Sequence, residues 1–172
     1  VAVLLRGYGT RRRNPCQVSS SSSCAEVGDE ALEYAQSLGE GVAWVGSNRR
    51  QSAALAEAAG ATVILLDDGL QHWRLGRDLD LSLLDRKHGL GNRLVFPAGP
   101  LREPLDQLAR ADGLVFTGAE PVEPLPPMPL GWPSHKPRFD VRFCLLPPAQ
   151  LQQEPLVAFC GIGLPEKFFS AL

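Results

Sequence analysis

Two adjacent carboxylates at the end of a short apolar run are the strongest chemical signal in the sequence. Asp67 and Asp68 directly follow residues 62–66, Thr-Val-Ile-Leu-Leu, and precede Gly69. A run of this kind ending in Asp-Asp-Gly is typical of a buried parallel strand whose carboxyl end opens into a site. Two anions there need a counter-charge, and in phosphoryl-transfer enzymes this is Mg²⁺ carrying nucleotide phosphates. The alternative is a strand that ends in an ordinary Asp-Gly turn.

The elements that position this pair follow a regular pattern along the chain. Apolar strand candidates alternate with helical patterns, which predicts βαβ units and a mostly parallel sheet flanked by helices. The expected strands cover residues 1–5, 42–45, 62–66, 79–84 and 114–117, and the expected helices cover 30–37, 49–59 and 104–110.

The remaining segments are irregular or less clear. Residues 10–24 contain a serine run and are expected to form a polar loop. Residues 120–137 hold seven prolines, which excludes a regular helix or a central strand and predicts a connector. Residues 138–146 alternate apolar and polar side chains as in an exposed antiparallel strand. Residues 156–160 are expected to form a buried strand, after which a helix begins.

Composition restricts the class of protein. The 172 residues are 44% hydrophobic and 21% charged, as in an ordinary soluble domain, and the net charge of -2 gives no general case for nucleic-acid binding. The basic clusters at residues 11–13 and 49–50 are expected to be solvated loops. The four cysteines have no C-x-x-C spacing, so a zinc site is not expected. No uninterrupted apolar segment approaches the length of a membrane span.

Five blocks, spread over nearly the whole sequence and in one order, resemble the tetraacyldisaccharide 4'-kinase family. Arg-Gly-Tyr-Gly is residues 6–9, Val-Gly-Asp-Glu is 27–30, and the acidic block is 67–73 together with Arg77 and Asp78. Pro-Ala-Gly-Pro-Leu-Arg-Glu-Pro is residues 97–104, and Gly-Ile-Gly-Leu-Pro-Glu-Lys-Phe-Phe is 161–169. The resemblance implies a P-loop NTPase-like α/β fold with a proline-rich connector and an antiparallel ribbon that leads to a second lobe.

The resemblance also implies a division of the chain and an activity. Residues 1–119 would be a partial kinase core lacking the Walker A loop, 120–155 the connector and ribbon, and 156–172 the start of a truncated C-terminal lobe. The implied reaction is ATP-dependent phosphorylation of the 4'-hydroxyl of a tetraacyldisaccharide 1-phosphate in lipid A biosynthesis, with ATP and Mg²⁺ as cofactors.

The same resemblance gives expectations about partners and location. A lipid A disaccharide precursor is the expected substrate, and a membrane surface is expected to be contacted through an N-terminal segment that this sequence lacks. The chain is expected to be a monomer that binds no nucleic acid. The cytoplasmic face of a bacterial inner membrane is the expected location, and a mitochondrion or plastid of a plant or alga is the alternative.

Residue roles follow from the matched blocks. Asp67 and Asp68 resemble a Walker B pair that would hold Mg²⁺, and Gln71 is a polar neighbour on the same turn that would help bind the cofactor. Asp29 matches the family's general base, and a carboxylate can accept the hydroxyl proton as the new bond forms. Asp29 could instead cap a helix, because an acidic side chain at a helix start satisfies free N–H groups. Arg6 is expected to bind the nucleotide phosphates, where a planar fork of donors fits well.

Three further residues are expected at the substrate. These are Glu30, Gly99 and Arg102, and Gly99 with its neighbouring prolines would shape a rigid loop. Arg6 and Arg102 could instead form structural ion pairs with Glu30 and Glu103, and the sequence does not separate these alternatives.

The sequence contains no G-x-x-x-x-G-K-[ST] motif, because its three lysines, Lys87, Lys136 and Lys167, are followed by His, Pro and Phe. The chain is therefore expected to be a fragment or truncated relative with little activity by itself. One alternative is a non-catalytic relative that binds a nucleotide or a partner. Another is a nucleotide-independent sugar-phosphate enzyme that uses Asp29 and Asp67 as an acid/base pair.

Overall fold

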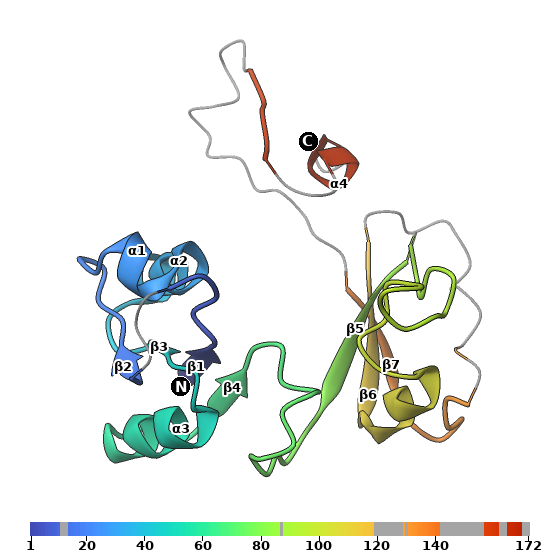
Figure 1. Cartoon of the computed structure of the whole chain (residues 1–172), viewed down its shortest axis with the longest axis horizontal. Coiled ribbons are helices and arrows are strands. Elements are labelled where there is room, and N and C mark those ends of the chain that lie inside the picture. The colour runs from blue at the N-terminus through green and yellow to red at the C-terminus, as the bar shows by residue number, and fades with distance from the viewer. Residues whose placement is uncertain are drawn as a thin grey trace. The chain divides into compact units, whose positions relative to one another are not determined.

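The structure, a computed structural model (Figure 1), describes residues 1–10, 14–86, 88–118, 129, 131–141, 157–161 and 165–169. It divides into one unit of Val1–Asp78 and a second of Leu79–Leu172. The three-part division at residues 119 and 155 stays a prediction.

The first unit is built on a four-stranded sheet in the order β2-β3-β1-β4. The three longer strands of this sheet are parallel, as the alternation of strands and helices in the sequence predicts, and they include the strand before the acidic pair. The short edge strand β2 runs antiparallel to β3. The strands are β1 (Ala2–Leu5), β2 (Cys16–Gln17), β3 (Ala43–Val45) and β4 (Ile64–Leu66).

Helices cover both faces of this sheet (Figure 1). Val3 and Leu5 of β1 belong to the core on the side of α2, whereas Leu4 belongs to the core on the side of α3. This arrangement follows from the alternation of side chains along a strand, which makes β1 apolar on both faces. The helices are α1 (Cys24–Val27), α2 (Asp29–Leu38) and α3 (Arg49–Ala58).

The second unit contains a three-stranded parallel sheet in the order β5-β6-β7. The 3₁₀ helix η1 (Leu105–Arg110) lies where the sequence predicts a short proline-initiated helix. Lys136 Nζ donates to the carbonyls of Ala109 and Ala111 at 2.8 Å, and its positive charge suits the carboxyl end of a helix. The other elements are β5 (Leu81–Asp85), β6 (Gly113–Thr117), β7 (Arg138–Val141) and α4 (Pro165–Phe169).

The antiparallel ribbon expected over residues 138–146 is wrong for the part that the structure describes. Strand β7 covers Arg138–Val141 and pairs parallel to β6, with Val115 opposite Phe139. Alternating polarity shows that one face of a strand is exposed, but it carries no information on strand direction. The connection of residues 118–137 exceeds the roughly dozen residues that a parallel crossover needs, so either direction is accessible. Residues 142–146 lie outside the described part.

Two other segments also differ from expectation. The polar loop predicted for residues 10–24 contains β2 and the first residue of α1. Val18, immediately after β2, is fully buried, and its N–H donates to Ala43 O at 2.8 Å. The sequence signal was dominated by the serines around these few apolar residues. The buried strand predicted at 156–160 is not seen in the described residues 157–160, where Val157 and Phe159 are exposed. Among the described residues, no helix is long and apolar enough to cross a membrane.

Candidate functional site

The carboxyl ends of three parallel strands of the first unit come together at one edge of the sheet. Asp67 N donates to Leu4 O at 3.2 Å, and Gly46 N donates to Leu5 O at 3.1 Å. The backbone pairing with β1 therefore continues one residue beyond the ends of β3 and β4. Arg6, which directly follows β1, therefore lies between the residues that follow β3 and β4. In open α/β sheets, this edge is where ligands bind.

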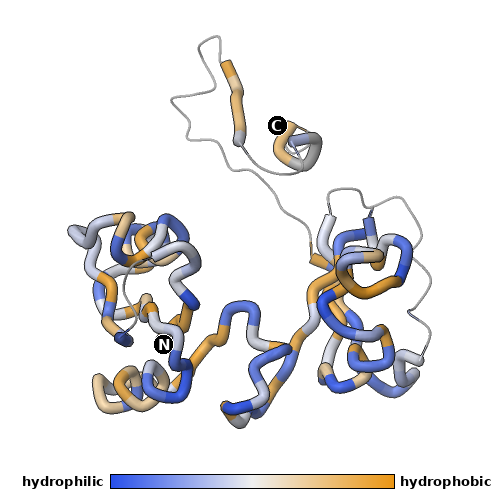
Figure 2. The backbone as a smooth tube through the Cα atoms, viewed as in Figure 1, coloured by the Kyte–Doolittle hydropathy of each residue, from blue (hydrophilic) through white to orange (hydrophobic). Residues whose placement is uncertain are grey.

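The turn after β4 has a conformation that its Asp-Gly sequence supports. Asp68 has a positive φ of 50°, which Asp tolerates better than most residues. A Cβ on Gly69 would lie 2.8 Å from Leu66 Cδ2, so the backbone passes Leu66 where only glycine fits without a shift. His72 N donates to Gly69 O at 2.8 Å, and Arg77 Nη1 donates to His72 O at 2.6 Å, which closes the turn. Figure 2 shows the hydrophobic strand β4 leading into this hydrophilic turn.

Asp29 and Glu30 begin α2 after the N-cap Gly28, whose φ of 90° suits glycine. Asp29 is thus the first residue of the helix and not its N-cap, and its Oδ1 accepts from Glu30 N at 3.0 Å, which occupies one carboxylate oxygen at the helix terminus. This is the one hydrogen bond to the Asp29 side chain that we find among the described residues. The second oxygen can therefore have another role.

The charges of the two acidic blocks act on each other. The pKa of Glu30 is raised, first by burial and then by Asp67, Asp29, Asp68 and Glu33. Because the charges of Asp67 and Asp68 act on Glu30, the start of α2 lies near the turn after β4, although the two blocks are far apart in the sequence. Carboxylates gathered in this way favour a cation among them.

This field predicts a pH dependence for stability. A raised native pKa means that the charged form of Glu30 destabilises the native state. The native state therefore gains stability as the pH falls from neutral through that pKa. We expect Glu30→Gln to raise the free energy of unfolding by about 0.5 kcal/mol at pH 7, because the repulsion is largely solvent-screened. The gain should disappear below pH 4.5, the ordinary pKa of the group. Urea unfolding at pH 7 and pH 4 measures both values.

Glu40→Gln provides a control of opposite sign. The Ser20 hydroxyl and backbone N–H donate to Glu40 Oε1 at 2.6 and 2.9 Å and lower the pKa of Glu40. Its charged form is therefore the stabilised one, and its substitution should reduce stability at pH 7. A Glu30→Gln variant that is destabilised at pH 7 would contradict the proposed repulsion.

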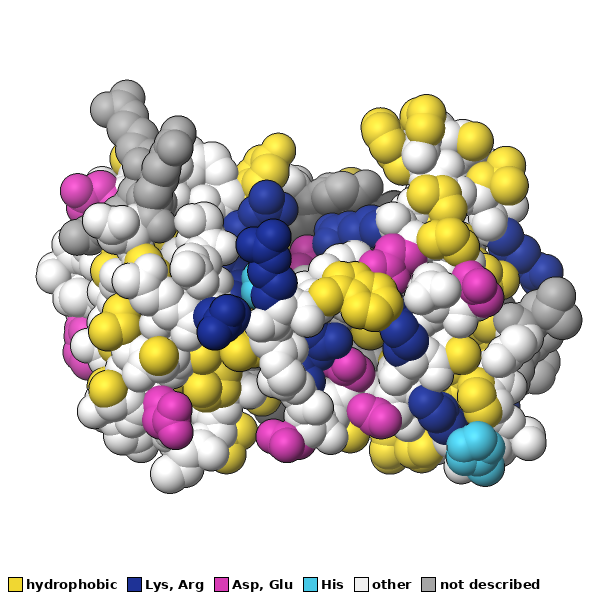
Figure 3. Space-filling view, turned by 60° about the horizontal axis from the view of Figure 1, so that its bottom comes forward, with side chains coloured by type: hydrophobic (Ala, Val, Ile, Leu, Met, Phe, Trp, Pro, Cys, Tyr) yellow, Lys and Arg dark blue, Asp and Glu magenta, His cyan; other side chains and the backbone are white. Residues whose placement is uncertain are grey.

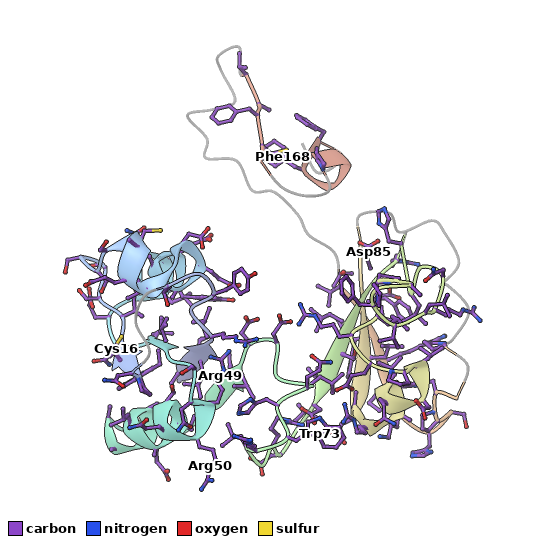
Figure 4. All side chains as sticks on the ribbon, in the orientation of Figure 1. Cys16, Arg49, Arg50, Trp73, Asp85 and Phe168 are labelled. Carbon is purple, nitrogen blue, oxygen red and sulfur yellow. The ribbon has the colours of Figure 1, made fainter. Side chains whose placement is uncertain are left out.

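Arg49 is the member of this site that sequence reasoning missed. Arg49 is only 6% exposed, and its Nη1 donates to Gly46 O at 2.9 Å. Burial lowers the pKa of Arg49, Asp67 and Asp68 raise it, and Arg6 lowers it. Figure 4 shows Arg49 directed toward the sheet while its neighbour Arg50 points away from α3. The guanidinium thus lies within the field of the acidic pair and of Arg6.

The expectation of a solvated loop at residues 49–50 is therefore wrong for Arg49, which begins α3 and is buried. Its position directly after a predicted parallel strand was the available signal, because such positions face the carboxyl edge of the sheet. Residues 11–13, the other basic cluster, include only positions outside the described part.

Arg49 and Arg50 form a natural pair of test and control. We expect Arg49→Ala to lower the free energy of unfolding by about 1.5–3 kcal/mol, because it leaves Gly46 O without its charged donor. Arg50→Ala, on the exposed side of the same helix turn, should change it by less than about 0.5 kcal/mol. Equal losses in a urea titration would show that Arg49 is not specifically anchored.

The histidine of the acidic block contributes to the turn through its backbone. The pKa of His72 is lowered by burial and then by Arg49, Arg77 and Arg74. The imidazole is therefore neutral near pH 7, and the positive field around it comes from arginines. These guanidinium groups favour the binding of an anion next to the acidic pair.

The remaining predicted residues are placed less closely. Arg6 is exposed and Gln71 is half-buried, both in the first unit. Gly99 and Arg102 belong to the second unit, whereas this site is built from residues of the first. A Cβ on Gly99 would overlap Asn92 Oδ1 and Leu94 O, which supports a structural need for glycine there. Arg110 Nη2 donates to Glu103 Oε2 at 2.5 Å.

Carboxylates are the side chains of this site that could bind a metal ion. Among the described residues, no group of three or more His, Cys, Asp or Glu side chains could hold a metal ion. Mg²⁺, however, usually keeps several waters and is bound by one or two carboxylates together with substrate phosphates. Asp67 and Asp68, whose field reaches Glu30, fit an ion that arrives with a nucleotide.

Comparison with known proteins gives one consistent result. The family description "Tetraacyldisaccharide-1-P 4'-kinase" matches residues 1–172. A tetraacyldisaccharide 4'-kinase of Gluconobacter oxydans is 40% identical over 99% of this chain, and one of Bradyrhizobium diazoefficiens is 44% identical over 99%. The alignments cover 51% and 50% of those two proteins, so the chain spans about half the length of these curated relatives.

A solved structure agrees with the sequence matches. The "apo" form of LpxK from Aquifex aeolicus in complex with ATP has a TM-score of 0.76 and 32% identity, covering 98% of this chain and 56% of that one. The predicted α/β class with a mostly parallel, helix-flanked sheet is thereby confirmed. At this identity, the similarity concerns the family as well as the fold.

Proposed function

Because the chain belongs to the tetraacyldisaccharide 4'-kinase family, we propose that it contributes to ATP-dependent phosphorylation of the 4'-hydroxyl of a tetraacyldisaccharide 1-phosphate in lipid A biosynthesis. The observation that carries the proposal is the meeting of two acidic blocks with Arg6 and Arg49 in one electrostatic field at the carboxyl edge of the first sheet. Carboxylates beside guanidinium groups suit a phosphate–metal pair better than either ion alone.

Each side chain then has a chemical task. Asp67 and Asp68 would hold Mg²⁺, which when bound neutralises charge on the transferring phosphate. Arg6 and Arg49 would bind anionic phosphate oxygens, and Gln71 would donate or accept a hydrogen bond on the same turn. The anchoring of Arg49 on Gly46 O limits its motion, which lowers the entropic cost of holding a phosphate.

Asp29 would accept the proton of the attacking hydroxyl. Its Oδ1 already takes the N–H of Glu30, so the proposal assigns the proton to the other oxygen. Glu30, Gly99 and Arg102 would contact the sugar or its phosphate. For the latter two, the tightly packed Gly99 and the family match of the block support the proposal.

The proposed setting is the cytoplasmic face of a bacterial inner membrane, with a lipid A precursor as substrate. Its bacterial relatives support this setting over a plant or algal organelle. We also propose that the protein is a monomer and that it contacts the membrane surface.

The test compares two polypeptides. The 172-residue chain is expected to transfer phosphate from ATP at under roughly 1% of the rate of the product of its natural reading frame, because its sequence lacks the motif that cradles phosphates. Thin-layer separation of the lipid product from radiolabelled ATP measures both rates. Full activity of the chain alone would contradict this expectation, and inactivity of the complete product would favour a non-catalytic binding relative.

A further inference from the structure

The loop between β5 and η1 is exposed and internally braced. Asn92 Nδ2 donates to Ala98 O at 2.8 Å, and Leu94 N donates to Asn92 Oδ1 at 3.2 Å. Leu101 N donates to Leu94 O at 3.1 Å, and Phe96 N donates to Leu101 O at 2.8 Å. Together with the tightly packed Gly99, these bonds brace residues 92–101 from within the loop.

This braced loop presents apolar side chains to solvent. Leu94, Val95 and Phe96, here named the apolar tip, are 52%, 36% and 79% exposed. Hydrophobic side chains also reach the surface elsewhere, as Figure 3 shows for one face. In the apolar tip, three large apolar residues are consecutive, and the backbone that carries them is braced by hydrogen bonds within the loop. Contiguous exposed apolar surface of this kind marks an interaction site.

The charge around the apolar tip has one sign. Between Asp85 and Glu103 the sequence has no acidic residue, whereas Arg93 directly precedes the tip and is exposed. Glu103 is bonded to Arg110, and Arg86 is paired with Asp140 at 3.3 Å. The loop is therefore locally basic in a chain of net charge -2, and it complements an anionic surface.

We propose that the apolar tip inserts into the surface of an anionic lipid bilayer, with Arg93 against the headgroups. Apolar side chains flanked by arginines gain hydrophobic burial and headgroup attraction at the same depth of a membrane interface. The choice of a lipid surface over a protein rests on the proposed function, whose substrate is a membrane lipid. A preformed loop loses little conformational entropy on insertion.

Flotation with vesicles that contain no disaccharide lipid tests the proposal. One set is pure phosphatidylcholine, and the other contains phosphatidylcholine and phosphatidylglycerol at roughly three to one, a composition with the anionic surface that attracts basic residues. The chain is expected to float with the anionic vesicles. Phe96→Ser should lower its partition coefficient roughly tenfold. Phe96→Trp should keep it, because Trp is favourable at this interface.

Matched controls separate the tip from general surface hydrophobicity and charge. Leu38→Ser removes an exposed leucine at the end of α2 and should leave partitioning unchanged. Arg93→Asn keeps a residue that tolerates the φ of 65° at this position and should weaken anionic binding about fivefold, with no effect on neutral vesicles. Arg50→Gln on α3 should have no effect.

Three outcomes would overturn the proposal: no flotation of the chain, equal losses for Phe96→Ser and Leu38→Ser, or a Phe96→Ser effect on self-association alone. Phe96→Trp with wild-type thermal unfolding but lost flotation would also overturn it. ATP transfer by the product of the natural reading frame is measured separately. Retained transfer without tip-dependent flotation rejects only this inference, and tip-dependent flotation without transfer rejects only the proposed kinase function.

Discussion

Asp29→Asn is expected to lower kcat by roughly 10²–10⁴-fold in the product of the natural reading frame, with ATP affinity unchanged. An amide cannot accept the hydroxyl proton, but its oxygen can still take the N–H of Glu30 that Asp29 Oδ1 now accepts at 3.0 Å. The substitution therefore removes the base and preserves the contact at the helix start. Phosphoryl transfer to the lipid substrate gives kcat, and nucleotide titration by calorimetry gives the affinity.

Glu33→Gln is the matched control for Asp29. It lies one turn further along α2 and also raises the pKa of Glu30, so it removes a negative charge from the same field. Its effect on kcat should be less than about threefold, since it is assigned no proton. If Asp29→Asn leaves kcat unchanged, or if both variants lose the same activity through charge alone, Asp29 is not the base.

Asp67→Asn is expected to weaken Mg²⁺-dependent ATP binding by at least about 100-fold. Even the loss of outer partners of metal ligands costs 10–100-fold in metal affinity. The same substitution should lower the pKa of Glu30 in the absence of Mg²⁺, because Asp67 is the largest charge contribution to its raised value. Weaker nucleotide binding together with a lowered pKa of Glu30 is the signature of a carboxylate kept for a cation.

Asp78→Asn serves as the control for this second prediction. Asp78 is an exposed carboxylate in the same unit and does not contribute to the Glu30 shift. Its substitution should change neither quantity. An Asp67→Asn variant that binds Mg²⁺ and ATP normally but no longer turns over substrate would instead support the acid/base reading of Asp29 and Asp67.

Local patterns accounted for most elements near the candidate site. The strands ending at Leu5, Val45 and Leu66 and the helices over Asp29–Leu38 and Arg49–Ala58 lie within a few residues of their predicted positions. Their signals are short-range: runs of aliphatic residues, a helical period, and glycine or asparagine at a boundary. The five family blocks added the proposed roles of Asp29, Asp67 and Asp68, which remain predictions.

Features that depend on distant partners were not accessible in this way. The direction of β7 depends on the path of the preceding connection, and β2 exists because Cys16 and Gln17 pair with the edge of β3. Arg49 and Arg50 have the same local sequence signal, yet only one is buried. A charge run alone cannot report which of its members faces a sheet.

The sequence by itself determined that this protein has alternating strands and helices, and that an acidic pair ends one of its strands. These properties follow from side-chain period, turn chemistry and residue order, which are local. Only the tertiary structure decided that the start of α2, the turn after β4, Arg6 and Arg49 share one field. The physical reason is that Coulomb interactions depend on distance in space, and that distance is set by the parallel pairing of β3, β1 and β4.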